Sequence, residues 1–281
     1  MKADAAPPSA TVAQALRAAA ARLEAVSATP RLDAELLMAH ALHVEREAIL
    51  LSRLDAEAPA GFEALVRRRE ASEPIAYITG RRAFWTIELE VGPGVLVPRP
   101  DSETLIEAAV AHFGAAGPAT ILDLGAGPGT LLLAALDQWP RARGLGVEAS
   151  EAALAFARRN AERLGLAERA SFRLGDWDAG IAERFDLILC NPPYIASAAE
   201  LPRDVSQWEP HEALFAGPDG LDAYRRLAPR LRRLLAPGGI ACVEIGAGQA
   251  AAVRALFEGQ AFTISSRLDL KGLPRCLSLR D

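Results

Sequence analysis

The sequence lacks any apolar run long enough to span a membrane, and its first ten residues, MKADAAPPSA, lack the apolar core of a secretory signal. It also lacks an excess of basic residues, because the formal net charge is −5 at pH 7. Proteins that bind bare nucleic acid usually carry a basic surface. We therefore expect a cytoplasmic protein with no membrane partner and no direct, sequence-specific nucleic-acid binding.

Cysteine is also scarce. The chain has three cysteines, Cys190, Cys242 and Cys276, which are odd in number and widely scattered. Their spacing fits neither a zinc site nor a disulfide framework, and two of them lie in apolar runs typical of strands. We expect reduced core residues and no metal site.

What the 281 residues do contain is enough apolar sequence, 51%, to bury a real core. Residues 9–72 have the three- and four-residue apolar spacing of helices only. One helix should follow the capping box of Thr11 and Gln14, a second should begin near Pro30, and a third should run from about Glu57 to Ala71. From Phe84 the apolar period changes to two, which predicts a short strand or hairpin.

After residue 118, apolar strand-like runs alternate with helical stretches, which predicts an α/β fold with a doubly wound, mostly parallel sheet of seven strands. The expected strands are TILDLG, GLGVE, ASFRLG, FDLILC, IACVEIG, FTISSRLD and CLSLR. No helix separates the last two runs, so we expect an antiparallel hairpin at one sheet edge. The expected domains are an all-α amino-terminal domain (1–75), a linker with a short β-hairpin (76–100) and a Rossmann-like domain (101–281).

A glycine-rich loop, GAGPGT, follows the first of these strands. Its Gly125, Gly127 and Gly129 permit a tight turn and close approach of a ligand to the backbone. Thr130 stands where the dinucleotide fingerprint has its third glycine, and no Gly-Lys-Ser/Thr follows, so neither a nicotinamide cofactor nor a nucleoside triphosphate is favoured. A purely structural turn remains an alternative.

Acidic and aromatic residues follow the next two strands. Glu148 ends the second strand, where its two oxygens could accept hydrogen bonds from both ribose hydroxyls of a nucleoside. After the third strand, Asp176 could accept from an exocyclic amine and Trp177 could pack on adenine. The alternatives are a helix-capping acid at Glu148 and a partly buried surface aromatic at Trp177. The combination resembles the class I methyltransferases, which implies S-adenosylmethionine as co-substrate.

The fourth strand runs into Asn191-Pro192-Pro193-Tyr194. In those enzymes, such motifs occur where the methyl acceptor is a planar nitrogen. The Asn191 side-chain carbonyl and the Pro192 backbone carbonyl, held rigidly by the two prolines, could each accept one N–H, and Tyr194 could stack on the flat group. A strand-ending turn with Asn191 as a cap is the alternative.

The chain as a whole is similar to the peptide chain release factor glutamine-N5 methyltransferase family. The resemblance rests on EPIAYITG, VLVPRPDSE, LDLGAGPGT, NPPYI, WEPHEAL, DGLDAYR, EIGAGQ and DLKGLPR. It implies methylation of the glutamine in the Gly-Gly-Gln motif of bacterial class 1 release factors by a catalytic site of Asn191, Pro192 and Tyr194. It also implies that the co-substrate contacts Gly125, Ala126, Gly127, Pro128, Gly129, Glu148, Trp177 and Asn191, and that the glutamine is held by Asn191, Pro192, Pro193 and Tyr194.

The chain departs from the family in its glycine loop, where Ala126 and Pro128 replace the more usual Thr or Ser, and at Glu148, where Asp is usual. Asp101 is expected to cap a helix. Family positions without an assigned step are Arg99, Glu103, Glu209 and Glu244.

Three other functions compete with this one. A ribosomal-protein glutamine methyltransferase shares the motif, a nucleic-acid amino-methyltransferase would need a basic recognition segment, and a non-catalytic binding protein would have a broken motif. PRPDSE and DLKGLPR favour the release factor family. We expect a monomer whose helical domain binds the release factor at a site distant from the glutamine that is methylated.

Overall fold

The computed structural model describes residues 10–178 and 180–281, which form two compact units. The first contains the residues up to Gly80 together with Leu201–Trp208, and the second contains Arg81–Glu200 and Glu209–Asp281. Residues 201–208 were expected in the Rossmann-like domain, whereas the structure groups this segment with the amino-terminal helices. Within the described ranges, no helix combines the length and apolar character needed to cross a bilayer.

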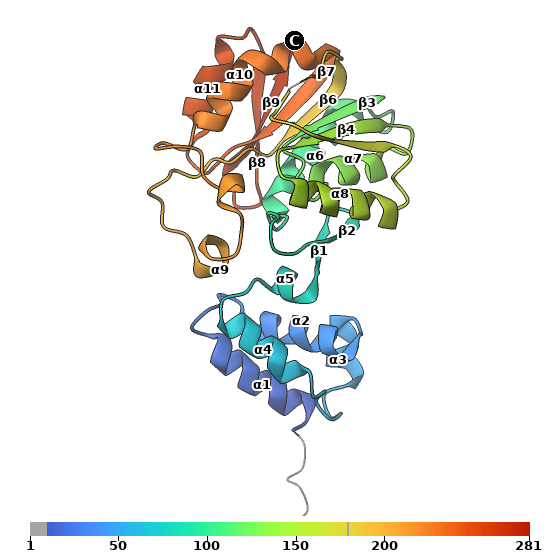
Figure 1. Ribbon diagram of the computed structural model, residues 1–281, viewed down its shortest axis with the longest axis vertical. Coiled ribbons are helices and arrows are strands. Elements are labelled where there is room, and N and C mark those ends of the chain that lie inside the picture. The colour runs from blue at the N-terminus through green and yellow to red at the C-terminus, as the bar shows by residue number, and fades with distance from the viewer. Residues whose placement is uncertain (1–9, 179) are drawn as a thin grey trace, which may run out of the picture. The chain divides into compact units, whose positions relative to one another are not determined.

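The first unit is entirely helical (Figure 1). Its helices are α1 (Val12–Leu23), α2 (Pro30–Leu42), α3 (Arg46–Ser52), α4 (Phe62–Glu70), α5 (Ile75–Thr79) and α9 (Arg203–Ser206). The predicted capping box is confirmed, because the Thr11 hydroxyl accepts from Gln14 N and the Gln14 side chain accepts from Thr11 N. Pro30 is the first residue of α2, where its missing N–H is not needed.

The third predicted helix is wrong at its start, since α4 begins at Phe62 rather than near Glu57. Pro59 and Gly61 precede it in a turn, and Pro59 O accepts from Phe62 N. The short helices α3 and α5 were not predicted. Their few residues present too little apolar periodicity to be recognised in the sequence.

The core of this unit comes from every described helix of the first 80 residues. Its buried apolar side chains include Val12, Leu16, Leu23, Leu37, Met38, Ile49, Phe62, Val66 and Ile78. Arg69 is a buried charged residue of this unit, with only 5% of its surface exposed. Its guanidinium pairs with Asp33 at 2.8 Å and Asp204 at 3.4 Å. It also donates to the carbonyls of Val26 and Glu73, so one buried cation joins α2, α4 and α9.

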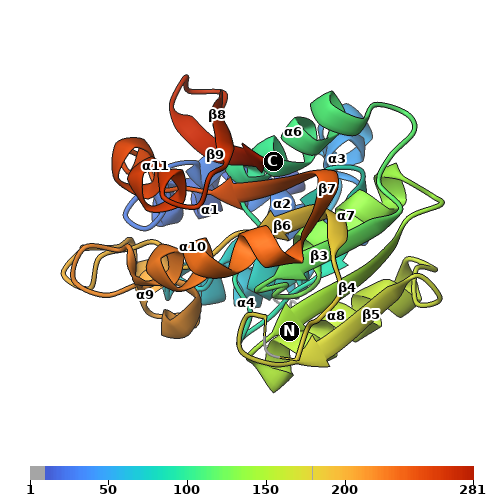
Figure 2. The same cartoon turned by 90° about the horizontal axis from the view of Figure 1, so that it is seen from above.

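The second unit is built on a seven-stranded sheet with the order β5-β4-β3-β6-β7-β9-β8, which Figure 2 follows from β8 across to β5. Its strands are β3 (Thr120–Leu124), β4 (Arg143–Glu148), β5 (Ala170–Leu174), β6 (Phe185–Cys190), β7 (Leu235–Glu244), β8 (Thr263–Leu268) and β9 (Pro274–Arg280). β3 to β7 are parallel, while β9 runs antiparallel to both neighbours and β8 forms the edge. The predicted fold class and edge hairpin are confirmed.

Helices cover both faces of this sheet (Figure 1). They are α6 (Glu103–Phe113), α7 (Thr130–Gln138) and α8 (Glu151–Arg163) on one face and α10 (Asp222–Leu234) and α11 (Ala250–Glu258) on the other. Short 3-10 helices, η1 (Pro100–Ser102) and η2 (His211–Ala213), and the antiparallel hairpin of β1 (Arg81–Phe84) and β2 (Ile87–Glu90) complete the unit.

The strand sequences explain why both faces are covered. Every second residue of four adjacent strands points into the cluster beneath α10 and α11: Leu122, Leu124, Ile188, Cys190, Ala241, Val243, Leu277 and Leu279. The alternate residues of these strands point to the opposite face, and among them Ile121, Leu187 and Leu189 are equally buried. Strands buried on both sides carry continuous apolar runs, as the sequence showed. The three cysteines are buried and unbonded, as predicted.

We predict that Asp33→Ala destabilises the helical unit by about 3 kcal/mol, because the buried Arg69 guanidinium would lose its nearest counter-charge. The matched control is Glu63→Ala, which removes an exposed partner of Arg22 in the same unit and should cost less than about 1 kcal/mol. Native-state hydrogen exchange of α2 and α4 in the full chain measures both. Equal loss of protection in the two variants would contradict the prediction.

Candidate functional site

A cavity of about 640 Å³ lies beyond the carboxyl ends of β3, β4, β5 and β6, within the roughly 300–1,000 Å³ range of small-molecule sites. β3 has β4 on one side and β6 on the other, so this is the switch point of the doubly wound sheet. The sequence-predicted residues that line the cavity are Gly125, Ala126, Gly127, Pro128, Glu148, Asp176, Trp177, Asn191 and Pro193.

The glycine loop connects β3 to α7 in a conformation that side chains disfavour. Gly125, Gly127 and Gly129 have φ values of +77°, +56° and +89°. Gly129 does not line the cavity; it caps α7 at its amino terminus, and a Cβ there would lie 2.8 Å from the Leu133 side chain. Its role in the described structure is therefore to let α7 start close to the sheet.

Glu148, at the end of β4, holds the glycine loop in place. Its Oε2 accepts from Gly127 N at 2.8 Å, and its Oε1 accepts from Ser150 N at 2.9 Å. Each carboxylate oxygen has two acceptor sites, so one on each oxygen remains for a ligand that enters the cavity. The carboxylate thus joins the loop, the strand and the start of α8 while facing the predicted ribose position.

Asp123 is a cavity residue that the sequence analysis missed. It is fully buried in β3, where Oδ2 accepts from Leu132 N at 3.0 Å and Oδ1 has no hydrogen-bond partner among the described residues. Burial raises the pKa of this carboxyl to about 7, and the Leu132 N–H partly opposes that rise. A lone acid in the apolar run TILDL was the signal that could have revealed it.

Trp177 and Asp176 form one wall of the cavity. A Cβ at Gly125 would lie 4.0 Å from the Trp177 ring and 4.0 Å from the Asn191 carbonyl oxygen, so three sequence-distant motifs meet here. The Arg226 guanidinium of α10 pairs with the Asp176 carboxylate and lies 5.9 Å from the Trp177 ring centroid. Arg226 was not predicted as a site residue, because nothing in sequence relates α10 to the turn after β5.

Asn191 begins the acceptor motif at the end of β6. Its Nδ2 donates to the Ser102 hydroxyl at 3.2 Å. Asn191 and Pro193 line the cavity, whereas Pro192 is buried and neither Pro192 nor Tyr194 is part of the lining. Ser102, which is 2% exposed and does line the cavity, is a third residue, after Asp123 and Arg226, that was not predicted from the sequence.

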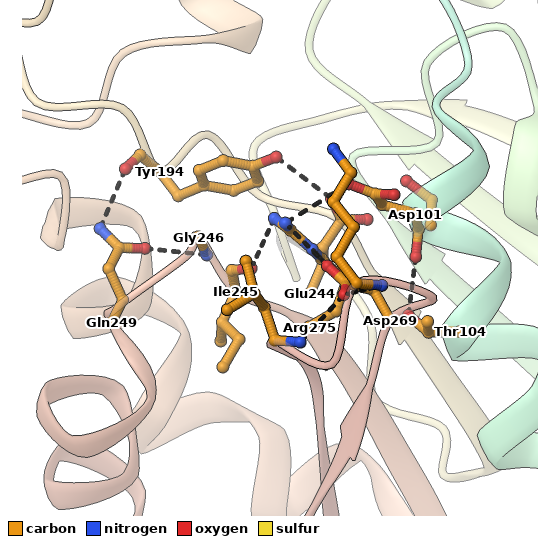
Figure 3. A network of polar contacts seen from close by, with 12 residues as sticks. Asp101, Thr104, Tyr194, Glu244, Ile245, Gly246, Gln249, Asp269 and Arg275 are labelled. Carbon is orange, nitrogen blue, oxygen red and sulfur yellow. Dashed lines mark hydrogen bonds and ion pairs between the residues drawn. The ribbon is translucent and has the colours of Figure 1, made fainter.

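Tyr194 lies in a polar network with Glu244 and Gln249 (Figure 3). Its hydroxyl donates to Glu244 Oε1 at 3.2 Å. Burial raises the pKa of the Tyr194 hydroxyl, and the nearby Glu244 carboxyl adds to that rise. Tyr194 therefore stays protonated and remains a donor throughout the neutral range.

The unassigned family residues Arg99, Glu103 and Glu209 have structural partners. Glu209 is 4% exposed; its Oε1 pairs with the Arg99 guanidinium, and its Oε2 accepts from Val97 N at 3.0 Å. Glu103 Oε1 accepts from Trp85 N at 2.9 Å in the turn of the β1–β2 hairpin. The two arginines that line the cavity, Arg99 and Arg226, are thus each paired with a carboxylate.

The prediction that Asp101 caps a helix is wrong. Asp101 lies inside η1, and its carboxylate forms an ion pair with Arg275 at 3.3 Å instead. The charge of a long-range partner on β9 outweighs the local capping preference, and no feature of PRPDSE reveals that partner.

Two family models match the chain. One describes a PrmC N-terminal domain and matches residues 14–80; the other describes a methyltransferase domain and matches residues 118–263. Among curated relatives, a release factor glutamine methyltransferase of Rhodospirillum rubrum is 46% identical over 89% of this chain and 79% of its own length. One of Cereibacter sphaeroides is 45% identical over 95% and 98%.

Solved structures share the fold at low sequence identity. A methyltransferase from Pyrococcus furiosus matches with a TM-score of 0.51 and 18% identity, over 77% of this chain and 96% of its own. A 16S rRNA N2 methyltransferase of T. thermophilus in complex with AdoMet and guanosine matches with a TM-score of 0.52 and 22% identity, over 72% and 50%. These matches support the class I methyltransferase fold of the second unit.

We predict that Asp123→Asn reduces the dependence of stability on pH. The unfolded chain loses this proton near pH 4 and the folded chain near pH 7, so the proton stabilises the fold at low pH and its contribution falls as pH rises through that window. The substitution should remove a decline on the order of 4 kcal/mol over the whole window, of which about 3 kcal/mol falls between pH 5 and pH 8. Glu244, whose pKa burial also raises to about 7, keeps part of the decline.

Urea unfolding at pH 5 and pH 8 measures the difference. Asp137→Asn, at an exposed carboxylate next to Thr86, is the control and should behave as the native chain does. An unaltered difference between the two pH values in Asp123→Asn would refute the assignment.

Proposed function

The chain belongs to the release factor glutamine methyltransferase family, and we propose that it transfers a methyl group from S-adenosylmethionine to the side-chain amide nitrogen of the glutamine in the Gly-Gly-Gln motif of class 1 release factors. The observation that carries the proposal is the meeting of two motifs at one cavity. The glycine loop and the Asn-Pro-Pro-Tyr motif follow neighbouring strands, and the loop lines the same cavity as Asn191 and Pro193 of that motif. The release factor specificity follows from the family rather than from the cavity.

The cavity fits S-adenosylmethionine, which supplies an electrophilic methyl group on a sulfonium. The free acceptor sites of Glu148 suit the two ribose hydroxyls, and the Trp177 face suits adenine. The pairing of Arg99 and Arg226 with carboxylates leaves little attraction for a pyrophosphate. Because Asp176 already pairs with Arg226, the exocyclic amine of adenine would have to compete with Arg226 for the Asp176 carboxylate.

The acceptor motif would orient the glutamine amide. With Nδ2 of Asn191 bonded to Ser102, its Oδ1 is available to accept one N–H of the substrate amide. The Pro192 carbonyl would accept the other, and the proline rings restrict the backbone that carries it. An amide nitrogen is a weak nucleophile because its lone pair is delocalised. Fixing its two protons on oxygen acceptors aligns it for attack and favours the positive charge that develops on nitrogen.

The helical unit would bind the release factor away from the reacting glutamine. The support is an exposed apolar site on α3, where Leu51 is 84% exposed and Leu50 is 38% exposed. Removing such apolar surface from water when a partner covers it is favourable. Because release factors act in translation, we place the enzyme in the cytoplasm, and we propose that it acts as a monomer without direct nucleic-acid recognition.

We predict that Asn191→Ala lowers methyl transfer to a Gly-Gly-Gln peptide on the order of 10²-fold, because the substrate amide loses an orienting acceptor. Mass spectrometry of the peptide should detect one added methyl group with the native enzyme and almost none with the variant. Gln260→Ala removes a carboxamide that does not line the cavity and should leave turnover unchanged. Normal turnover by Asn191→Ala would exclude Asn191 from the mechanism.

We predict that Leu51→Ser raises KM for intact release factor about tenfold while leaving KM for the peptide unchanged, since only the intact factor reaches α3. Leu270→Ser alters a leucine that is 102% exposed in the second unit and serves as the matched control. Steady-state kinetics with both substrates measures the effect. An increase in KM with Leu270→Ser but not with Leu51→Ser would reject the helical unit as the docking site.

A further inference from the structure

The EIGAGQ motif begins at Glu244, the last residue of β7, and has no role in the function derived so far. Its residues Glu244 and Gln249 contact Tyr194 from both sides (Figure 3). Glu244 Oε1 accepts from the Tyr194 hydroxyl at 3.2 Å, and Gln249 Nε2 donates to the Tyr194 carbonyl at 3.0 Å. Gln249 is itself held by Gly246 N, which donates to its Oε1 at 3.0 Å. The side chain and the backbone of Tyr194 are therefore both fixed by one loop.

Gly246 is required by this packing. A Cβ at Gly246 would lie 3.0 Å from Tyr194 Cδ2 and 2.6 Å from Gln249 Oε1. The tyrosine ring thus occupies the space that a side chain would need. Within the described structure, the loop after β7 is shaped around the acceptor motif rather than around the cavity.

Ser102 links the same network to Asn191. Its hydroxyl accepts from Asn191 Nδ2 at 3.2 Å, and its interaction with the Glu244 carboxyl lowers the pKa of that carboxyl. A serine hydroxyl can accept one hydrogen bond while donating another, whereas an ionised carboxylate can only accept. An ionised Glu244 therefore favours a Ser102 proton that points toward it, which leaves the Ser102 lone pairs to face Asn191.

That direction determines the orientation of the Asn191 amide. Only its NH₂ group can bond to a lone pair on Ser102, so its carbonyl oxygen must turn the other way. We propose that Glu244 and Ser102 are positioning residues that fix the Asn191 carboxamide with its oxygen available to the substrate, while Glu244 and Gln249 fix Tyr194. The orientation itself concerns only this chain, but its catalytic value rests on the proposed function.

The groups around Glu244 come from several elements. Those that face it are Arg275 of β9, Asp101 and Ser102 of η1, Tyr194 after β6, Cys190 of β6 and Tyr224 of α10, whose hydroxyl donates to the Glu244 backbone carbonyl. Burial raises the pKa of the Glu244 carboxyl to about 7, against the opposing effects of Ser102, Arg275 and Tyr194. Its Oε2 lacks a partner at normal hydrogen-bond distance among the described residues.

Protonation of Glu244 would remove this constraint on the direction of the Ser102 proton, because a carboxylic acid can itself donate a hydrogen bond. Ser102 could then accept from Glu244 and donate to the Asn191 oxygen, which would turn the amide nitrogen toward the cavity. Glu244 is thus expected to hold Asn191 in its productive orientation above about pH 7 and to release it below that value.

Nuclear magnetic resonance tests the orientation without substrate or co-substrate. The chain contains two asparagines, Asn160 and Asn191, so ¹⁵N-asparagine labelling gives two side-chain NH₂ signals. The Asn191 signal should shift with a midpoint near pH 7 in the native chain and should not titrate in Ser102→Ala or Glu244→Gln. Asn160, which donates to Glu90 O and Pro128 O, is the internal reference.

Asp123 also titrates near pH 7 and lines the same cavity, so the variants distinguish the two acids. An Asn191 signal that still titrates in Glu244→Gln would overturn the proposal. So would a native Asn191 signal that does not respond to pH. Neither outcome depends on whether the chain methylates a release factor.

Kinetics with the Gly-Gly-Gln peptide tests the catalytic consequence. Ser102→Ala should lower kcat about tenfold at pH 8 with no change in KM for S-adenosylmethionine, since it loosens Asn191 without removing it. Adding Glu244→Gln should cost no more than the larger single effect, because both residues act through the orientation of the same Asn191 side chain. The control is Ser278→Ala, at a buried hydroxyl on β9, which should leave kcat unchanged.

A kcat for Ser102→Ala equal to that of the native enzyme would refute the positioning role, as would independent, additive losses in the double variant. Failure of the native enzyme to methylate the peptide or the intact factor would instead refute the proposed function.

Discussion

The hydrogen bond from the Asn191 amide nitrogen to Ser102 determines what the rest of the site can do. A carboxamide has a donor end and an acceptor end of nearly equal size, and only the acceptor end can hold an N–H of a substrate amide. The strand end, the proline pair and the cavity bring Asn191 to the correct position. The orientation of its side chain is a separate requirement, and polar groups behind the cavity supply it.

Two carboxylates at strand ends each contact a different motif of this site. Glu148 ends β4 and shapes the glycine loop through Gly127 and Ser150, while Glu244 ends β7 and shapes the acceptor motif through Tyr194 and Ser102. Both lie at the edge where parallel strands terminate and backbone groups need new partners. In the proposed function, the same fold position therefore serves the co-substrate half of the site at β4 and the acceptor half at β7.

The sequence predicted the sheet and most cavity residues, because apolar alternation and strand-end motifs are local signals. It did not predict Ser102, Arg226 or the ion pair of Asp101 with Arg275, since each depends on elements that meet only in the folded chain. It also assigned 201–208 to the wrong compact unit, because that grouping depends on contacts such as Arg69 with Asp204 across 135 residues of sequence. The residues that the sequence did not predict are mostly the tertiary partners of charged side chains.

The division of the chain has a consequence for its own synthesis. A ribosome delivers α1 to α5 first, and they can pair Arg69 with Asp33 as they emerge. The last segment of that unit, Leu201–Trp208, is made only after four strands of the seven-stranded sheet, β3 to β6, have been translated. During synthesis, the amino-terminal unit therefore lacks Leu201–Trp208 until the Asn-Pro-Pro-Tyr motif has also been translated.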